Sequence, residues 1–162
     1  MAQDNTATQI TAIGNFKRVL AIRMKPKTDM LMEIEKACRQ YNIQNGVIVS
    51  GIGGVTRAAI CDPQYFPERK QPYNYGAPII IETHLSISGI SGIVCHDDDG
   101  TINTHIHVSF SDEEGHCYAG HLVEGTKVML TVDMLIAEVD GFSMSRKMDE
   151  ELEVPLFCPI QK

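Results

Sequence analysis

No two of the five cysteines lie close together in this 162-residue chain. Their number is odd, and their spacing fits neither a disulfide framework nor a CxxC zinc ribbon. Cysteines used in this way are typical of reduced side chains that pack in a core. We therefore expect a protein without disulfides and take the cytoplasm as its compartment.

Long apolar runs are missing as well, and the first ten residues, MAQDNTATQI, are polar and carry no basic flank. A membrane-spanning helix needs about 20 mostly apolar residues in succession. A secretory signal needs a positive flank followed by an apolar stretch. The sequence therefore predicts neither a membrane protein nor a secreted one.

Basic runs are also scarce, because the 14 lysines and arginines are scattered among 21 acidic residues and the formal net charge is −7. Proteins that grip nucleic-acid phosphates usually carry a basic patch. Nucleic acid is thus a disfavoured partner on composition alone.

The overall composition, with 43% hydrophobic and 22% charged residues, is that of an ordinary globular protein. A chain of this length suits one domain. We expect a flexible tail over residues 1–13 and one domain over 14–142. Residues 143–162 are expected to form an extension that docks on the domain or on a neighbouring subunit.

Hydrophobic periodicity gives the elements of that domain. Apolar residues at helical spacing predict one long amphipathic helix over 29–42, with Thr28 as its N-cap. β-branched runs predict strands at 16–24, 47–50, 55–61, 79–88, 92–95, 102–110 and 127–139. We therefore expect an α/β fold of the α+β type: a mainly antiparallel, twisted sheet with one long helix packed on it.

One segment stands apart, because residues 63–78 hold four of the seven prolines. This pattern indicates a long loop between two strands. Loops of such length in compact domains are commonly functional or mobile.

The chemistry of the sequence centres on His105-Ile106-His107, within a predicted strand. Side chains alternate along a strand, so the two imidazoles project from one face with their Cα atoms about 6.6 Å apart. His121 follows, and a returning antiparallel strand would bring it beside the pair, with Gly120 allowing close backbone approach. Three histidines suit a divalent ion, zinc above all, with a fourth position left open.

The histidine pair by itself is weak evidence, since isolated HxH patterns are common. Its face is polar, shared with Ser109, whereas Ile106 lies on the opposite face. A polar face is also what plain solvent exposure gives. His84 and Ser86 alternate in the same way and are candidates to line the pocket, although His84 also fits a hydrogen-bonded strand residue.

Two functions remain open for such a site. In one, the metal serves an enzyme that ionises water or polarises a carbonyl or carboxylate group, and Glu124 and Asp133 are the candidate acids or bases nearest in sequence. In the other, the site belongs to a binding or assembly module that holds a small molecule or anion. A site closed by four ligands would favour the second function.

The ordered motifs of the chain resemble the plant and prokaryote conserved (PPC) domain over roughly residues 15–140. They are the initial strand and helix, VSGIG at 49–53, LSISG at 85–89, HIHVS at 105–109, GHLVEG at 120–125 and the closing strand through Thr131. Each motif is weak alone, but their order and spacing together are fairly specific.

The resemblance implies a largely antiparallel α/β fold, a homotrimer and, in prokaryotic members, a metal held at the positions of His105, His107 and His121. Plant relatives join this domain to AT-hooks that bind DNA, and this sequence has no Arg-Gly-Arg-Pro core of such a hook. DNA binding or a regulatory role of the PPC type is therefore the alternative function. Two positions depart from the family pattern: Ala119 replaces a glycine, and His84 replaces an aliphatic residue.

Overall fold

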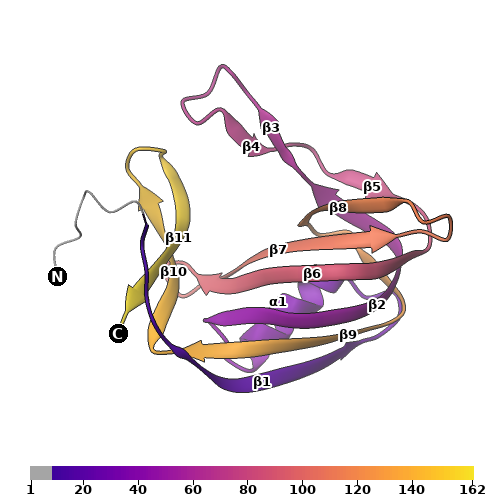
Figure 1. The fold of residues 1–162 in the computed structure, drawn as a ribbon, viewed down its shortest axis with the longest axis horizontal. Helices are drawn as coiled ribbons and strands as arrows, with labels where there is room; N and C mark the ends of the chain where they lie inside the picture. Colours follow the sequence, from indigo (N-terminus) through magenta and orange to yellow (C-terminus); the bar gives the residue numbers. More distant parts are fainter. Residues whose placement is uncertain (1–8) are drawn as a thin grey trace.

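The computed structural model describes residues 9–162, so residues 1–8 of the expected tail lie outside the described residues. The described chain holds eleven strands and one helix (Figure 1). In chain order they are β1 (Asn15–Met24), α1 (Met30–Gln40), β2 (Gly46–Cys61), β3 (Pro63–Tyr65), β4 (Tyr73–Tyr75), β5 (Ile79–Ile81), β6 (Leu85–His96), β7 (Ile102–Ser111), β8 (Cys117–Leu122), β9 (Lys127–Asp140), β10 (Phe142–Asp149) and β11 (Val154–Gln161).

The fold is mixed α+β and mostly strand, as expected, but the expectation of a long helix was wrong. Helix α1 has 11 residues and begins after Asp29, whose side chain accepts a hydrogen bond from the backbone N–H of Met32. The predicted cap, Thr28, instead donates its hydroxyl to the carbonyl of Lys25. The helix ends early because Asn42 adopts a left-handed conformation with φ 51°.

The main sheet is antiparallel through the pairs β1–β9, β9–β2, β2–β6, β6–β7 and β7–β8. The far end of β2 also pairs with β8 and with β5. The sheet therefore curls until β8 meets the end of β2, and this curl brings β8 near the segment that follows Cys61.

Several strand boundaries differ from those expected, two of them in and after β2. The predicted strands 47–50 and 55–61 are one continuous strand, β2, because its glycine-rich middle pairs with β9 through irregular register. The predicted strand 79–88 is interrupted, and residues 82–84 separate β5 from β6. Periodicity missed both because bulges and breaks in a strand are decided by the partner strand.

The hydrophobic core lies between α1 and one face of the sheet, which has the helix behind it in Figure 1. Met30, Ile34 and Cys38 of the helix are fully buried. On the sheet side, Ile106 and Phe110 of β7 are fully buried too. The alternate residues of β7 consequently project from the opposite, open face.

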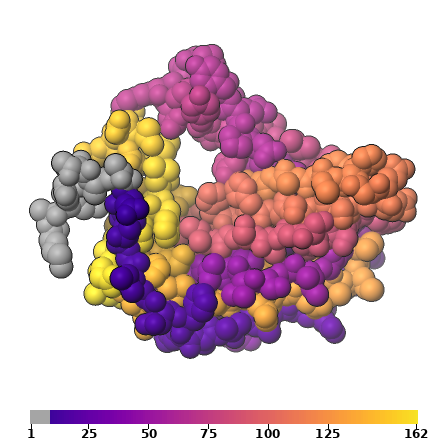
Figure 2. All heavy atoms as spheres, viewed as in Figure 1, coloured from indigo at the N-terminus to yellow at the C-terminus, as the bar shows by residue number. Residues whose placement is uncertain are grey.

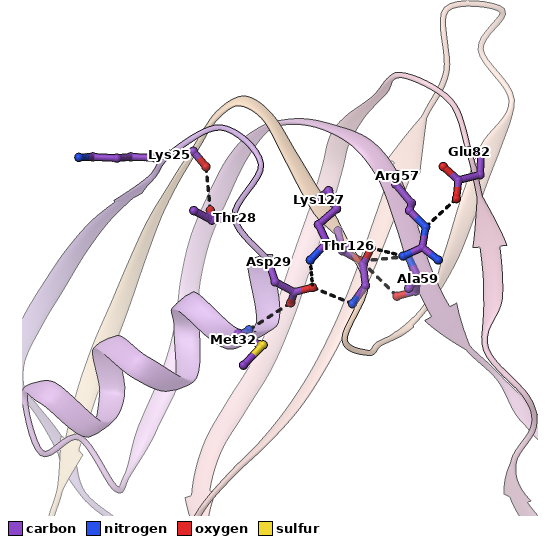
Figure 3. Close-up of polar contacts among 10 residues, drawn as sticks. Lys25, Thr28, Asp29, Met32, Arg57, Ala59, Glu82, Thr126 and Lys127 are labelled. Atoms are coloured by element: carbon purple, nitrogen blue, oxygen red, sulfur yellow. Dashed lines mark hydrogen bonds and ion pairs between the residues drawn. The ribbon is translucent and has the colours of Figure 1, made fainter.

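A polar network joins the helix to the turn between β8 and β9 (Figure 3). Asp29 accepts hydrogen bonds from the backbone N–H of Gly125 at 2.7 Å and from Lys127 Nζ at 3.2 Å. Buried Thr126 bonds to both the N–H and the carbonyl of Ala59 on β2. The network fixes the turn that follows β8 and thereby helps to set the position of that strand.

The chain after β9 forms a hairpin of β10 and β11, which joins the main sheet through a short parallel contact between Ser145 and His96. Arg146 pairs with Asp97 at 2.9 Å. At the other end of the chain, the backbone N–H of Ile13 donates to Gln161 of β11 at 3.0 Å.

The proline-rich segment 63–78 is not structureless: β3 and β4 pair into a two-stranded ribbon. Figure 2 shows this ribbon arching away from the body over an open gap, and Lys70 at its tip pairs with Glu153 in the turn of the C-terminal hairpin. Among the described residues, no helix is long and apolar enough to cross a membrane.

Candidate metal centre

His105 and His107 project together from the open face of β7. Ile106 between them is buried against the helix side, so the strand alternation that aims Ile106 inward aims both imidazoles outward. Their Nε2 atoms lie 3.2 Å apart. The spacing brings two ring nitrogens close enough to share one ion.

His121 reaches the pair through the β7–β8 hairpin, in which it lies directly opposite His107. Its ring centroid is 5.2 Å from that of His105 and 5.5 Å from that of His107. One ligand atom of each histidine lies within 4.8 Å of the others. No other group of three or more potential ligands occurs among residues 9–162.

The strands behind the site are packed closely. Gly92 of β6 lies opposite Ile106, and a Cβ atom at this glycine would lie 2.5 Å from the carbonyl oxygen of His105. On the other side, β8 is held by the pairing of His121 with Cys61. Rigid strands on both sides therefore preorganise the three imidazoles.

Tyr75, at the end of β4, is a fourth member of the cluster that the sequence did not reveal. Its hydroxyl lies 3.2 Å from His105 Nε2 and 3.5 Å from His107 Nε2. Its ring stacks on that of His121, with centroids 4.4 Å apart and an angle of 24°. The only sequence signal was the proline-rich segment that carries it.

The cluster favours neutral imidazoles. Desolvation by burial, and then the nearby His105 and His107, lower the pKa of His121 to about 4. Desolvation and His107 also lower the pKa of His105. Both rings are thus neutral at pH 7 and keep a lone pair for coordination, because a metal ion and a proton compete for the same nitrogen.

The pKa of Tyr75 is shifted upward, whereas the pKa values of His105 and His121 are lowered. Burial raises the pKa of its hydroxyl, and the neighbouring Cys61 and Asp62 raise it further. Without a metal, the phenol therefore keeps its proton at pH 7 and hydrogen-bonds to a histidine nitrogen.

One atom of the cluster is unsatisfied. Among the described residues, His121 Nδ1 is the only buried side-chain nitrogen or oxygen without a hydrogen-bond partner. Leaving such a group unpaired costs about 1–3 kcal/mol. The neutral imidazoles of His105 and His121, the adjacent ring of His107 and the orphaned ring nitrogen fit a bound divalent ion, and a nitrogen-rich set of this kind suits zinc.

The other predicted pocket residues are divided between separate places. Ser109 lines a hollow of about 320 Å³ beside His107, together with Ser91 and Gly120. His84 and Ser86 line a different hollow of about 540 Å³, which includes none of the three clustered histidines.

The two candidate acids also lie outside the histidine cluster. Glu124 is exposed in the β8–β9 turn. Asp133 of β9 pairs with Arg23 at 3.1 Å. A further hollow of about 610 Å³, lined mostly by apolar residues that include Phe16, Phe142 and Phe157, contains no histidine.

Residues 11–140 match the model of the Plants and Prokaryotes Conserved (PCC, also written PPC) domain. The chain belongs to this family. The resemblance carried by its motifs is thereby confirmed, over almost the same range as expected.

The chain is also similar to a segment of a much longer curated protein. The bifunctional protein GlmU of Synechococcus sp. (strain JA-3-3Ab) is 26% identical over 132 residues, which cover 82% of this chain and 19% of that protein. The chain therefore spans about a fifth of the length of this curated relative. The match indicates a shared domain and carries over no activity.

Solved structures have the same fold. A PPC protein from Pyrococcus horikoshii is 25% identical, with a TM-score of 0.72 over 95% of this chain and 97% of that one. A metal-containing protein from Archaeoglobus fulgidus is 24% identical, with a TM-score of 0.75 over 92% and 99%. A candidate DNA-binding protein from Bacteroides thetaiotaomicron is 16% identical, with a TM-score of 0.70 over 89% and 96%.

Proposed function

We propose that this PPC-domain protein binds one divalent metal ion, zinc, through His105, His107 and His121, and that the bound ion holds a small anionic ligand. The observation that carries the proposal is the convergence of three imidazoles whose ligand atoms lie within 4.8 Å of one another. The orphaned Nδ1 of His121 supports it, since coordination relieves an imidazole of this kind.

The hollow beside His107 supports the ligand part of the proposal. At about 320 Å³ it lies at the small end of ligand pockets, and it places Ser91 and Ser109 next to a candidate metal ligand. Hydroxyls beside a cation suit a carboxylate or a similar small anion. A metal ion bound there would supply charge that polarises such a group.

Assembly as a homotrimer is a second part of the proposal, and it rests on the family. The sheet face opposite α1 supports it, because it exposes 59% of Val19, 63% of Ile52 and 41% of Leu135. Apolar side chains gathered on one face are typical of surfaces that another chain covers.

The test is metal analysis of the purified protein together with zinc titration. We expect up to one zinc per chain in the wild type and none in His107→Ala. His116→Ala is the matched control. His116 Nδ1 lies 3.0 Å from Asp112 Oδ2 in an exposed turn, and His116 belongs to no group of three potential metal ligands among the described residues. Unchanged zinc binding in His107→Ala would remove the triad from the proposal.

DNA binding is the second candidate, favoured by the description of the Bacteroides relative. At 16% identity that likeness establishes the fold alone. The surface gives this candidate little support: all 14 lysines and arginines lie in the described chain, and only Lys25 and Lys27 have no carboxylate there within 4.0 Å. Cations already paired with carboxylates are poorly placed to replace counterions on phosphates.

A further inference from the structure

We infer that Tyr75 is the fourth ligand of the metal while no anion is bound, so that the resting site is a closed set of three histidine nitrogens and one phenol oxygen. The inference rests on the proposed function, because it names a further donor for the same ion. Three distances carry it: His105 Nε2 to His107 Nε2 is 3.2 Å, and the Tyr75 hydroxyl lies 3.2 Å and 3.5 Å from these two nitrogens.

These distances match three edges of the tetrahedron that four ligands form around a zinc ion. Donor atoms that lie about 2.1 Å from a tetrahedral zinc ion are about 3.4 Å from one another. The three observed distances lie on both sides of this value, so the two nitrogens and the phenol oxygen form a nearly equilateral triangle of the right size. An ion equidistant from these three atoms needs only the nitrogen of His121 to complete the set.

The backbone of the ribbon holds Tyr75 at this place. Tyr75 pairs with Pro63 at the base of the β3–β4 ribbon, and the next N–H, of Gly76, donates to the carbonyl of Asp62 at 3.0 Å. Asp62 follows Cys61, which pairs with His121. The same chain segment therefore anchors the ribbon and the third histidine, and the stacked ring of Tyr75 follows that histidine.

A hydrogen bond alone would not require this arrangement. A phenol that served only as a hydrogen-bond partner would need one nitrogen, whereas this hydroxyl lies near two that also approach each other. On coordination the O–H bond breaks, the oxygen donates an electron pair to the ion, and the proton passes to solvent. The opening of a coordination position would then require displacement of Tyr75.

The experiment uses Cu²⁺ as a spectroscopic probe, because copper binds imidazole sites more strongly than zinc does. With one equivalent of Cu²⁺, we expect the wild type to show the visible charge-transfer absorption of a copper-bound phenolate. Tyr75→Phe should lose this band while its d–d absorption shows that copper stays bound. Its zinc affinity should fall by about tenfold or more.

Tyr73→Phe is the matched control, since Tyr73 lies on the same strand and contacts Tyr65 at a ring distance of 5.3 Å. It should keep both the band and the zinc affinity. Copper binding without the band in the wild type, or a band that persists in Tyr75→Phe, would overturn the inference and leave the three-histidine proposal standing. Failure of the wild type to bind either metal would overturn both.

Discussion

His107 and His121 are direct cross-strand partners in the antiparallel β7–β8 pair. Side chains at such positions rise from the same face of a sheet, with Cβ atoms about 5 Å apart. His105 joins them from two residues along β7. The site therefore depends on a single hairpin for its three histidines, and on the β3–β4 ribbon for the phenol that covers them.

Removal of the metal should lower the stability of the protein. A ligand present at 100 times its dissociation constant stabilises the folded state by about 2.7 kcal/mol, which for a domain of this size corresponds to about 5–10 °C in Tm. We expect scanning calorimetry to show this increase when zinc is added to chelator-treated wild type. His107→Ala should show no increase, and an equal rise in that variant would place the stabilising zinc elsewhere.

Asp29→Ala should destabilise the fold by about 2 kcal/mol, because it removes the N-cap of α1 and leaves the N–H of Gly125 unpaired. Urea unfolding measures the change. Thr28→Ala is the control and should stay within about 0.5 kcal/mol, as the Thr28 hydroxyl makes one exposed hydrogen bond. Similar losses in both variants would show that the Asp29 network adds nothing to the turn.

The protein should be a homotrimer at micromolar concentration, in which neighbouring subunits cover the sheet face opposite α1. Light scattering coupled to size exclusion gives the mass directly. Substitution of exposed Leu135 by Glu should weaken the assembly, because a charge would then be buried between subunits. A monomeric mass for the wild type would count against the trimer.

Affinity for duplex DNA should be no better than the non-specific range of about 10⁻⁴ M at physiological salt. A basic ring in an oligomer would have to gather Arg18, Arg23 and Lys25 from several subunits. Arg18 and Arg23 are already paired with Glu138 and Asp133, which leaves only Lys25 of the three without a carboxylate within 4.0 Å in the described chain. A labelled duplex titrated at two ionic strengths measures the affinity and its salt dependence. Submicromolar, sequence-selective binding that survives raised salt would restore the DNA-binding candidate as the main function.

The local sequence pattern was sufficient to predict the histidine pair and the place of the helix. The two-residue period of a strand put His105 and His107 on one face, and the apolar Ile106 between them indicated which face is buried. The helix was found at the right place, but its length was overestimated, since the apolar spacing includes Tyr41, whereas the helix ends at Gln40 just before Asn42 turns left-handed. Capping and termination depend on single backbone conformations that periodicity does not report.

The long-range contacts were decided only by the tertiary structure. Alternation in the sequence made His84 a candidate to line the pocket, yet the interruption between β5 and β6 leaves it in another hollow. Tyr75 carries no local signal, because its approach to His105 follows from the pairing of β3 with β4 and from the curl that brings β8 to the end of β2. Strand register and sheet curvature depend on partners far along the chain, so the sequence supplied the three imidazoles, and the fold determined which other groups surround them.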